Sequence, residues 1–124
     1  MEMTEDSIDP AVRQRISAVI HSVLGQQAGR LGEMVCNDSE RIIGENLQRL
    51  IEIIRHTRSE QIEPYLIQFL EDICAHCPYQ YPSLHCARRH LHACALFECA
   101  SALVAGVASV LREAGDQEYQ QIHA

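Results

Sequence analysis

The chain has 124 residues, of which 47% are hydrophobic, and a formal net charge of −7. This length suits one compact domain, and the hydrophobic fraction is too high for a disordered protein. Ten basic residues stand against seventeen acidic ones, which disfavours nucleic-acid binding because that function needs a basic surface. All ten basic residues are arginine, so Schiff-base chemistry and a phosphate-loop lysine are excluded.

The sequence predicts a cytoplasmic protein that does not bind a membrane. Its longest apolar stretch, Ala100 to Leu111, is interrupted by serine and glycine and is shorter than the roughly 20 residues that cross a bilayer. The acidic first ten residues lack the apolar centre of a secretory signal. In the reducing cytosol a cluster of cysteines more often serves metal or redox chemistry than structural disulfides.

Along the chain we expect a flexible acidic tail over residues 1–8, a single helical domain over residues 9–115 and a C-terminal tail over residues 116–124. Asp9 followed by Pro10 predicts the start of the first helix, because Asp is a favoured N-cap and Pro suits the first helical position. Apolar residues then recur at helical spacing, and Gly25 can end the helix. Between residues 26 and 36, two glycines predict a short or irregular helix.

Two capping-box pairs predict the helices in the middle of the chain. Asn37 and Glu40 are expected to start a helix that continues to about residue 56. Thr57 and Glu60 repeat the pattern before a second helix, which carries Pro64 in or near its first turn and runs into residue 74.

The last predicted helix covers about residues 84–114 and ends at Gly115. It is apolar on nearly all sides between Ala93 and Leu111, and such a helix is normally central in a core or buried in an oligomer interface. No strand-like alternation appears. We therefore expect an all-α fold, a four- or five-helix bundle with a long apolar C-terminal helix, forming a homodimer built partly on that helix.

Potential metal ligands are concentrated in one segment. Five of the six cysteines and four of the seven histidines lie between residues 74 and 99. Cys74, Cys77, Cys86 and His90 follow the spacing C-x2-C-x8-C-x3-H. A CxxC at a helix end supplies two ligands, and two residues four apart on the next helix share a face and supply two more. Zinc takes four such ligands in a tetrahedron, so we predict a Zn²⁺ site at this helix–turn–helix corner.

Other ligands and other chemistries stay open. Two stripes along the last helix could join the site or hold copper or iron, and the Cys77-Pro78 pair could present a thiolate to haem, though zinc is preferred. The additional ligands in these stripes are Cys94, Cys99, His85, His92 and Glu98. Packing alone also explains cysteines inside an apolar helix. A buried Glu98 would need a metal, an arginine or a histidine as its partner.

The predicted function is a small cytosolic zinc-binding helical protein with a structural or regulatory role, acting as a sensor or through a protein partner. One alternative is a thiol redox sensor that uses Cys74, Cys77 and Cys86. Another is a helical interaction protein whose cysteines are only core residues. The chain shows no HExxH motif, no Ser-His-Asp order and no glycine-rich phosphate loop, so an enzyme is the less favoured interpretation.

Overall fold

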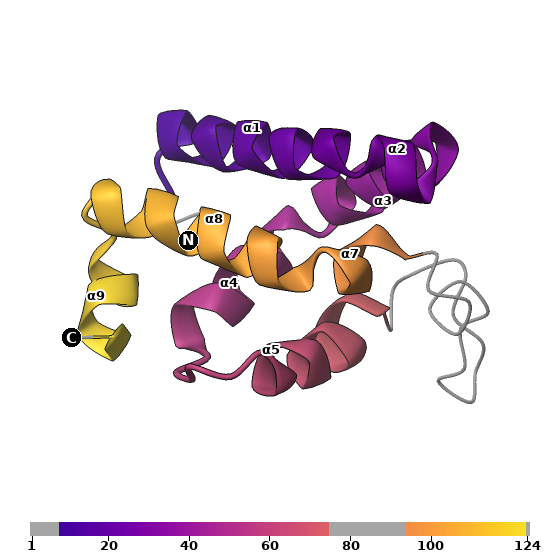
Figure 1. Cartoon of the computed structure of the whole chain (residues 1–124). Coiled ribbons are helices and arrows are strands. Elements are labelled where there is room, and N and C mark those ends of the chain that lie inside the picture. The colour runs from indigo at the N-terminus through magenta and orange to yellow at the C-terminus, as the bar shows by residue number, and fades with distance from the viewer. Residues whose placement is uncertain (1–7, 75–93, 124) are drawn as a thin grey trace.

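The computed structural model describes residues 8–74 and 94–123 (Figure 1). Every regular element within these two ranges is helical, which confirms the predicted all-α class there. No helix of the described ranges is both long and apolar enough to span a membrane.

Helix α1 (Pro10–Gln26) begins where the sequence predicts. Asp9 is its N-cap, its carboxylate accepts the Ala11 N–H at 2.8 Å, and a proline occupies the first turn. The helix ends one residue after Gly25. Its buried face, formed by Ile16, Ile20 and Leu24, packs against helices α8 and α3.

Gly32 separates the short helix α2 (Ala28–Leu31) from α3 (Glu33–Glu45). Its φ of 96° lies in the left-handed region that glycine adopts at low cost, and its carbonyl accepts the Cys36 N–H at 3.1 Å. The short helix in this region was predicted. The predicted helix start at Asn37 is wrong, because the chain already turns into α3 at Gly32.

Asn46 ends α3 and precedes α4 (Leu47–His56), so the single helix predicted over this region is two helices. The Asn46 side chain is buried and its amide donates to the Ile42 carbonyl at 2.8 Å. Its backbone leaves helical geometry at φ −119° and ψ 23°. Asn side chains compete with the backbone for such hydrogen bonds, and here that competition produces the break.

The next helical segment consists of α5 (Glu63–Gln68) and a π-helical turn, η1 (Phe69–Ile73), which ends at Cys74. The predicted start at Thr57 is wrong, since Thr57 is extended at the end of α4 and its carbonyl accepts the Tyr65 hydroxyl at 3.1 Å. Pro64 lies in the first turn of α5, as predicted.

The predicted final helix is interrupted in its described part, and its first ten residues lie outside the described residues. The structure has α7 (Ala95–Glu98) and α8 (Ala100–Glu113), with Cys94 extended before α7 and Cys99 non-helical between them. The Ala95 N–H donates to Ser39 Oγ at 3.2 Å, where a continuous helix would direct it to a carbonyl four residues earlier.

Gly115 ends α8 as predicted. It adopts φ 71°, its N–H donates to the Arg112 carbonyl at 3.2 Å, and the Asp116 N–H donates to the Leu111 carbonyl at 3.0 Å. These two bonds form a Schellman motif. The segment predicted as a tail then forms α9 (Gln117–His123), and its Tyr119 is buried.

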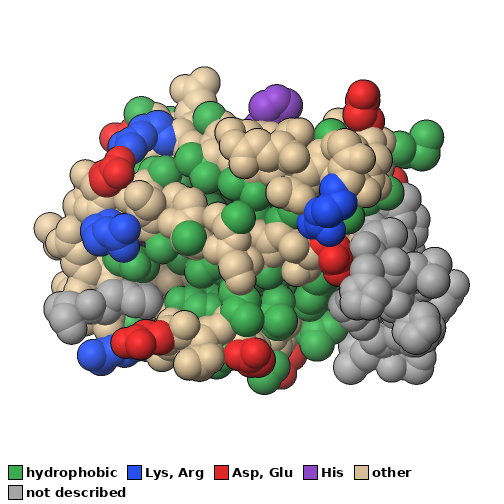
Figure 2. Space-filling view, viewed as in Figure 1, with side chains coloured by type: hydrophobic (Ala, Val, Ile, Leu, Met, Phe, Trp, Pro, Cys, Tyr) green, Lys and Arg blue, Asp and Glu red, His purple; other side chains and the backbone are tan. Residues whose placement is uncertain are grey.

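Helix α8 is buried on one face only. Its large apolar side chains point into the core, while Ser101, Ala102 and Ala105 are exposed. Figure 2 shows hydrophobic side chains following α8 and the seams on either side of it. Where α1 crosses α8, a Cβ added to Gly106 would lie 2.6 Å from Val19 Cγ1. This glycine therefore sets how closely the two helices approach.

Replacing Gly106 by alanine should destabilise the protein. Overpacking costs about 1–3 kcal/mol, while the gain in helix propensity returns at most about 1 kcal/mol. We expect a net loss on the order of 1 kcal/mol in the free energy of unfolding, measured by urea denaturation.

The matched control is Gly44→Ala in α3, where an added Cβ meets nothing within 4 Å. This variant should be as stable as the parent chain or more stable. Equal stability of the Gly106→Ala and Gly44→Ala variants would contradict the close approach of α1 and α8.

Candidate functional site

Cys74 is the one predicted zinc ligand that the structure describes. It is the C-cap residue of η1, and its side chain is buried, with 6% relative exposure. Cys77, Cys86 and His90 lie outside the described residues, so the predicted four-ligand set stays a prediction. His85 and His92, considered as additional ligands, also lie outside them.

Cys74 ends η1 and Cys94 precedes α7, and these two elements lie at the same end of the molecule (Figure 1). Phe69 of η1 and Phe97 of α7 hold this end together, since their rings meet edge to face with centroids 6.2 Å apart. The core therefore positions both ends of the segment that carries the other predicted ligands.

Cys99 has the environment of a core thiol. It is buried between α7 and α8, and burial is the largest cause that raises its pKa. Cys36, Glu98 and Cys94 raise this pKa further, while Arg30 opposes them. The raised pKa keeps the thiol protonated, which disfavours both metal binding and nucleophilic reactivity.

The expected ligand stripes do not continue on one helix through the described residues, because the backbone is extended at Cys94 and non-helical at Cys99. Glu98 has the kind of partner predicted for it, since its Oε1 lies 3.9 Å from an Arg30 Nη1. Within residues 8–74 and 94–123, one group of three potential ligands has all of its donor atoms within 4.8 Å of one another. This group contains no cysteine.

Arg55 on α4 is a buried charged residue, and its relative exposure is only 1%. Its Nε donates to Asp116 Oδ1 at 3.2 Å and its Nη2 to Asp116 Oδ2 at 2.6 Å. Burial opposes the charged guanidinium, but the Asp116 bond and the attraction of Asp116, Glu52 and Glu118 outweigh it and raise the pKa of Arg55. This two-point bond ties α4 to the residue that starts α9.

Asp116 also caps α9. Its Oδ1 accepts the Tyr119 N–H at 2.8 Å, and its carbonyl accepts the Gln120 N–H at 3.0 Å. One carboxylate therefore neutralises the buried arginine and satisfies the first turn of the helix. As a consequence, the first turn of α9 lies against the last turn of α4.

Three potential ligands meet beside this ion pair, namely Glu52, His56 and Glu118. His56 Nε2 lies 3.0 Å from Glu52 Oε1 and 2.8 Å from Glu118 Oε2. None of these three residues was predicted as a site residue from the sequence. The Glu52–His56 spacing of four residues was a visible signal, but Glu118 belongs to a segment predicted as a tail.

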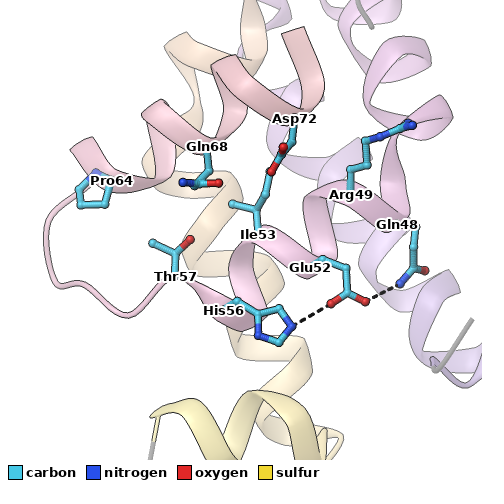
Figure 3. A pocket seen from close by; sticks show the side chains of 9 residues that line it. All are labelled: Gln48, Arg49, Glu52, Ile53, His56, Thr57, Pro64, Gln68 and Asp72. Atoms are coloured by element: carbon cyan, nitrogen blue, oxygen red, sulfur yellow. Dashed lines mark hydrogen bonds and ion pairs between the residues drawn. The ribbon is translucent and has the colours of Figure 1, made fainter. Parts of the chain in front are cut away.

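A groove of about 610 Å³ runs along this face of α4 towards α5. Figure 3 shows Glu52 and His56 on one side of the groove, with Gln68 and Pro64 of α5 across it. Gln48 donates to Glu52 Oε2 at 3.0 Å. The carboxylate–histidine group is therefore accessible from an open groove that is lined by both polar and apolar side chains.

Comparisons with protein-family models, with curated proteins and with solved structures found no match to this chain. The functional conclusions below therefore rest on the chemistry of the residues and on their geometry.

Asp116→Asn should destabilise the protein by about 2–3 kcal/mol, because Arg55 stays buried with its main counter-charge removed. Asparagine caps a helix about as well as aspartate, so the decrease in the free energy of unfolding measures the effect of removing the Asp116 charge. Urea denaturation measures it.

The control for this variant is Glu113→Gln, which removes the exposed Arg15–Glu113 pair at 2.8 Å. An exposed pair contributes at most about 1 kcal/mol. Similar losses in the Asp116→Asn and Glu113→Gln variants would show that the Arg55–Asp116 pair has no special role.

The raised pKa of Cys99 predicts slow alkylation in the native protein. At mildly alkaline pH, a brief pulse of iodoacetamide should modify Cys99 many-fold more slowly than the half-buried Cys94, because less thiolate is present and access is lower. In urea the two rates should become equal. Peptide mass spectrometry gives both rates, and equal native rates would contradict the assignment of Cys99 to the core.

Proposed function

We propose that the chain is a small helical protein that binds a transition metal, zinc in the first place, through Cys74, Cys77, Cys86 and His90. The spacing of these residues supplies three thiolates and one imidazole, a complete ligand set for a structural zinc site. Such a site contributes directly to folding free energy, since its ligands must be brought together.

The position of Cys74 is the observation that carries this proposal. Its backbone caps the end of η1, whose Phe69 and Ile73 belong to the hydrophobic core. The first ligand of the CxxC would therefore be held in place before metal binds, which lowers the ordering cost of the site. The edge-to-face pair of Phe69 and Phe97 supports the same end of the fold.

The proposed role of the metal is structural or regulatory. A metal bound by these four residues would tie the exit from η1 to a position further along the chain and stabilise the surface there for a partner or a sensor function. The predicted bundle and the predicted homodimer stay predictions. The exposed small residues of α8, Ser101, Ala102 and Ala105, would allow a second helix to approach closely, which is compatible with a dimer.

Cobalt substitution and elemental analysis of the untagged protein test this function. We expect about one tightly held zinc per chain, and Co²⁺ in its place should show an intense thiolate-to-metal charge-transfer band. Cys77→Ala and His90→Ala should abolish tight binding and remove the band. Cys36→Ala, which removes a buried cysteine of α3, is the matched control and should keep the band.

The proposal is wrong if the protein holds less than about 0.2 metal per chain and all six thiols titrate freely in the native state. Reversible loss of two thiols under mild peroxide in that metal-free protein would indicate the redox sensor instead. Inert thiols and no sensitivity to chelators would indicate core cysteines.

A further inference from the structure

The junction of α4 and α9 contains a second set of metal-type ligands, separate from the cysteines. Glu52 and His56 lie one turn apart on α4, and Glu118 comes from the first turn of α9. Both carboxylates direct one oxygen to the same nitrogen, His56 Nε2, at 3.0 Å and 2.8 Å. The three donor atoms all lie within 4.8 Å of one another.

Arg55 orients these two carboxylates from behind. Its Nη1 lies 3.1 Å from Glu52 Oε2 and 3.4 Å from Glu118 Oε1. Each carboxylate therefore uses one oxygen on the buried guanidinium and presents the other towards His56. Metal-binding carboxylates usually have such an outer partner, which sets their orientation. Arg55 is in turn held by Asp116.

The charge and the access suit a divalent cation. Three carboxylates (Glu52, Asp116 and Glu118) against one guanidinium leave a formal charge of −2, with His56 counted as neutral. The side chains of Glu52, His56 and Glu118 are 38%, 47% and 42% exposed, and Glu52 and His56 line the open groove. Water could therefore complete the coordination of a bound ion.

We propose that Glu52, His56 and Glu118 form a binding site for a divalent first-row transition metal, with Zn²⁺ as its natural probe. Three protein ligands with one open position is a known zinc arrangement. With bonds of about 2.0 Å, the ligand atoms of a zinc tetrahedron are about 3.3 Å apart. The two nitrogen–oxygen separations at His56, 3.0 Å and 2.8 Å, are a few tenths of an ångström shorter than this edge, and all three ligand atoms lie within 4.8 Å of one another.

Calorimetric titration of the full chain with Zn²⁺ tests the site. We expect His56→Ala and Glu118→Gln each to bind one equivalent of zinc fewer than the parent chain, or to bind that equivalent with greatly reduced affinity. The loss of affinity should exceed the roughly 10–100-fold loss that follows removal of an outer partner. His56→Ala leaves both contacts of Arg55 with the two glutamates in place, so its result stands even where Glu118→Gln weakens folding. Circular dichroism checks that each variant is folded.

The matched control is His21→Ala. His21 and Glu40 form an exposed histidine–carboxylate pair at 2.9 Å, and among the described residues no third potential ligand joins this pair. This control should bind zinc as the parent chain does. Unchanged stoichiometry and affinity in both His56→Ala and Glu118→Gln would overturn the proposal, as would an equal loss in His21→Ala.

The test separates this site from the cysteine site. Removing His56 should leave the thiolate charge-transfer band of the cobalt protein unchanged, while Cys77→Ala should remove the band and leave the Glu52–His56–Glu118 equivalent. Failure of one site therefore does not hide the other.

Discussion

The described part of the fold depends on how one buried cation is neutralised. Arg55 is 1% exposed, and an uncompensated charge in that position would cost several kcal/mol. Asp116 compensates it with two hydrogen bonds, and it can do so only because Gly115 turns the chain after α8. The ion pair therefore places α9 against α4 and brings Glu118 to Glu52 and His56, although Glu118 lies 63 residues after Arg55 in the sequence.

The chain has two candidate sites of different chemistry, and the second depends on this ion pair. The segment after η1 offers thiolates and histidines, which suit zinc and other soft or borderline metals, whereas the α4–α9 junction offers two carboxylates and one imidazole. Cys74, the first ligand proposed for the cysteine site, ends a helical segment, and Arg55 contacts both carboxylates of the second site. Cys99, buried with a raised pKa, belongs to the hydrophobic core.

Local signals in the sequence predicted the features whose causes are local. Asp9, Pro64 and Gly115 occupy the capping and turn positions expected of them. The helix breaks at Asn46 and Cys94 could not be predicted from the sequence. The first depends on the buried Asn46 amide, which donates to the Ile42 carbonyl. The second depends on the Ala95 N–H, which donates to Ser39, 56 residues earlier in the chain. In the sequence, His56 cannot be distinguished from an ordinary surface residue, because its second carboxylate partner, Glu118, comes from another helix.

X-ray absorption at the zinc edge of the zinc-loaded chain tests the central claim, that the cysteine–histidine segment binds metal, most directly. With one equivalent of zinc, the account predicts a sulfur shell at about 2.3 Å together with a nitrogen contribution at about 2.0 Å. A spectrum with oxygen and nitrogen neighbours only, at about 2.0–2.2 Å, would contradict the claim.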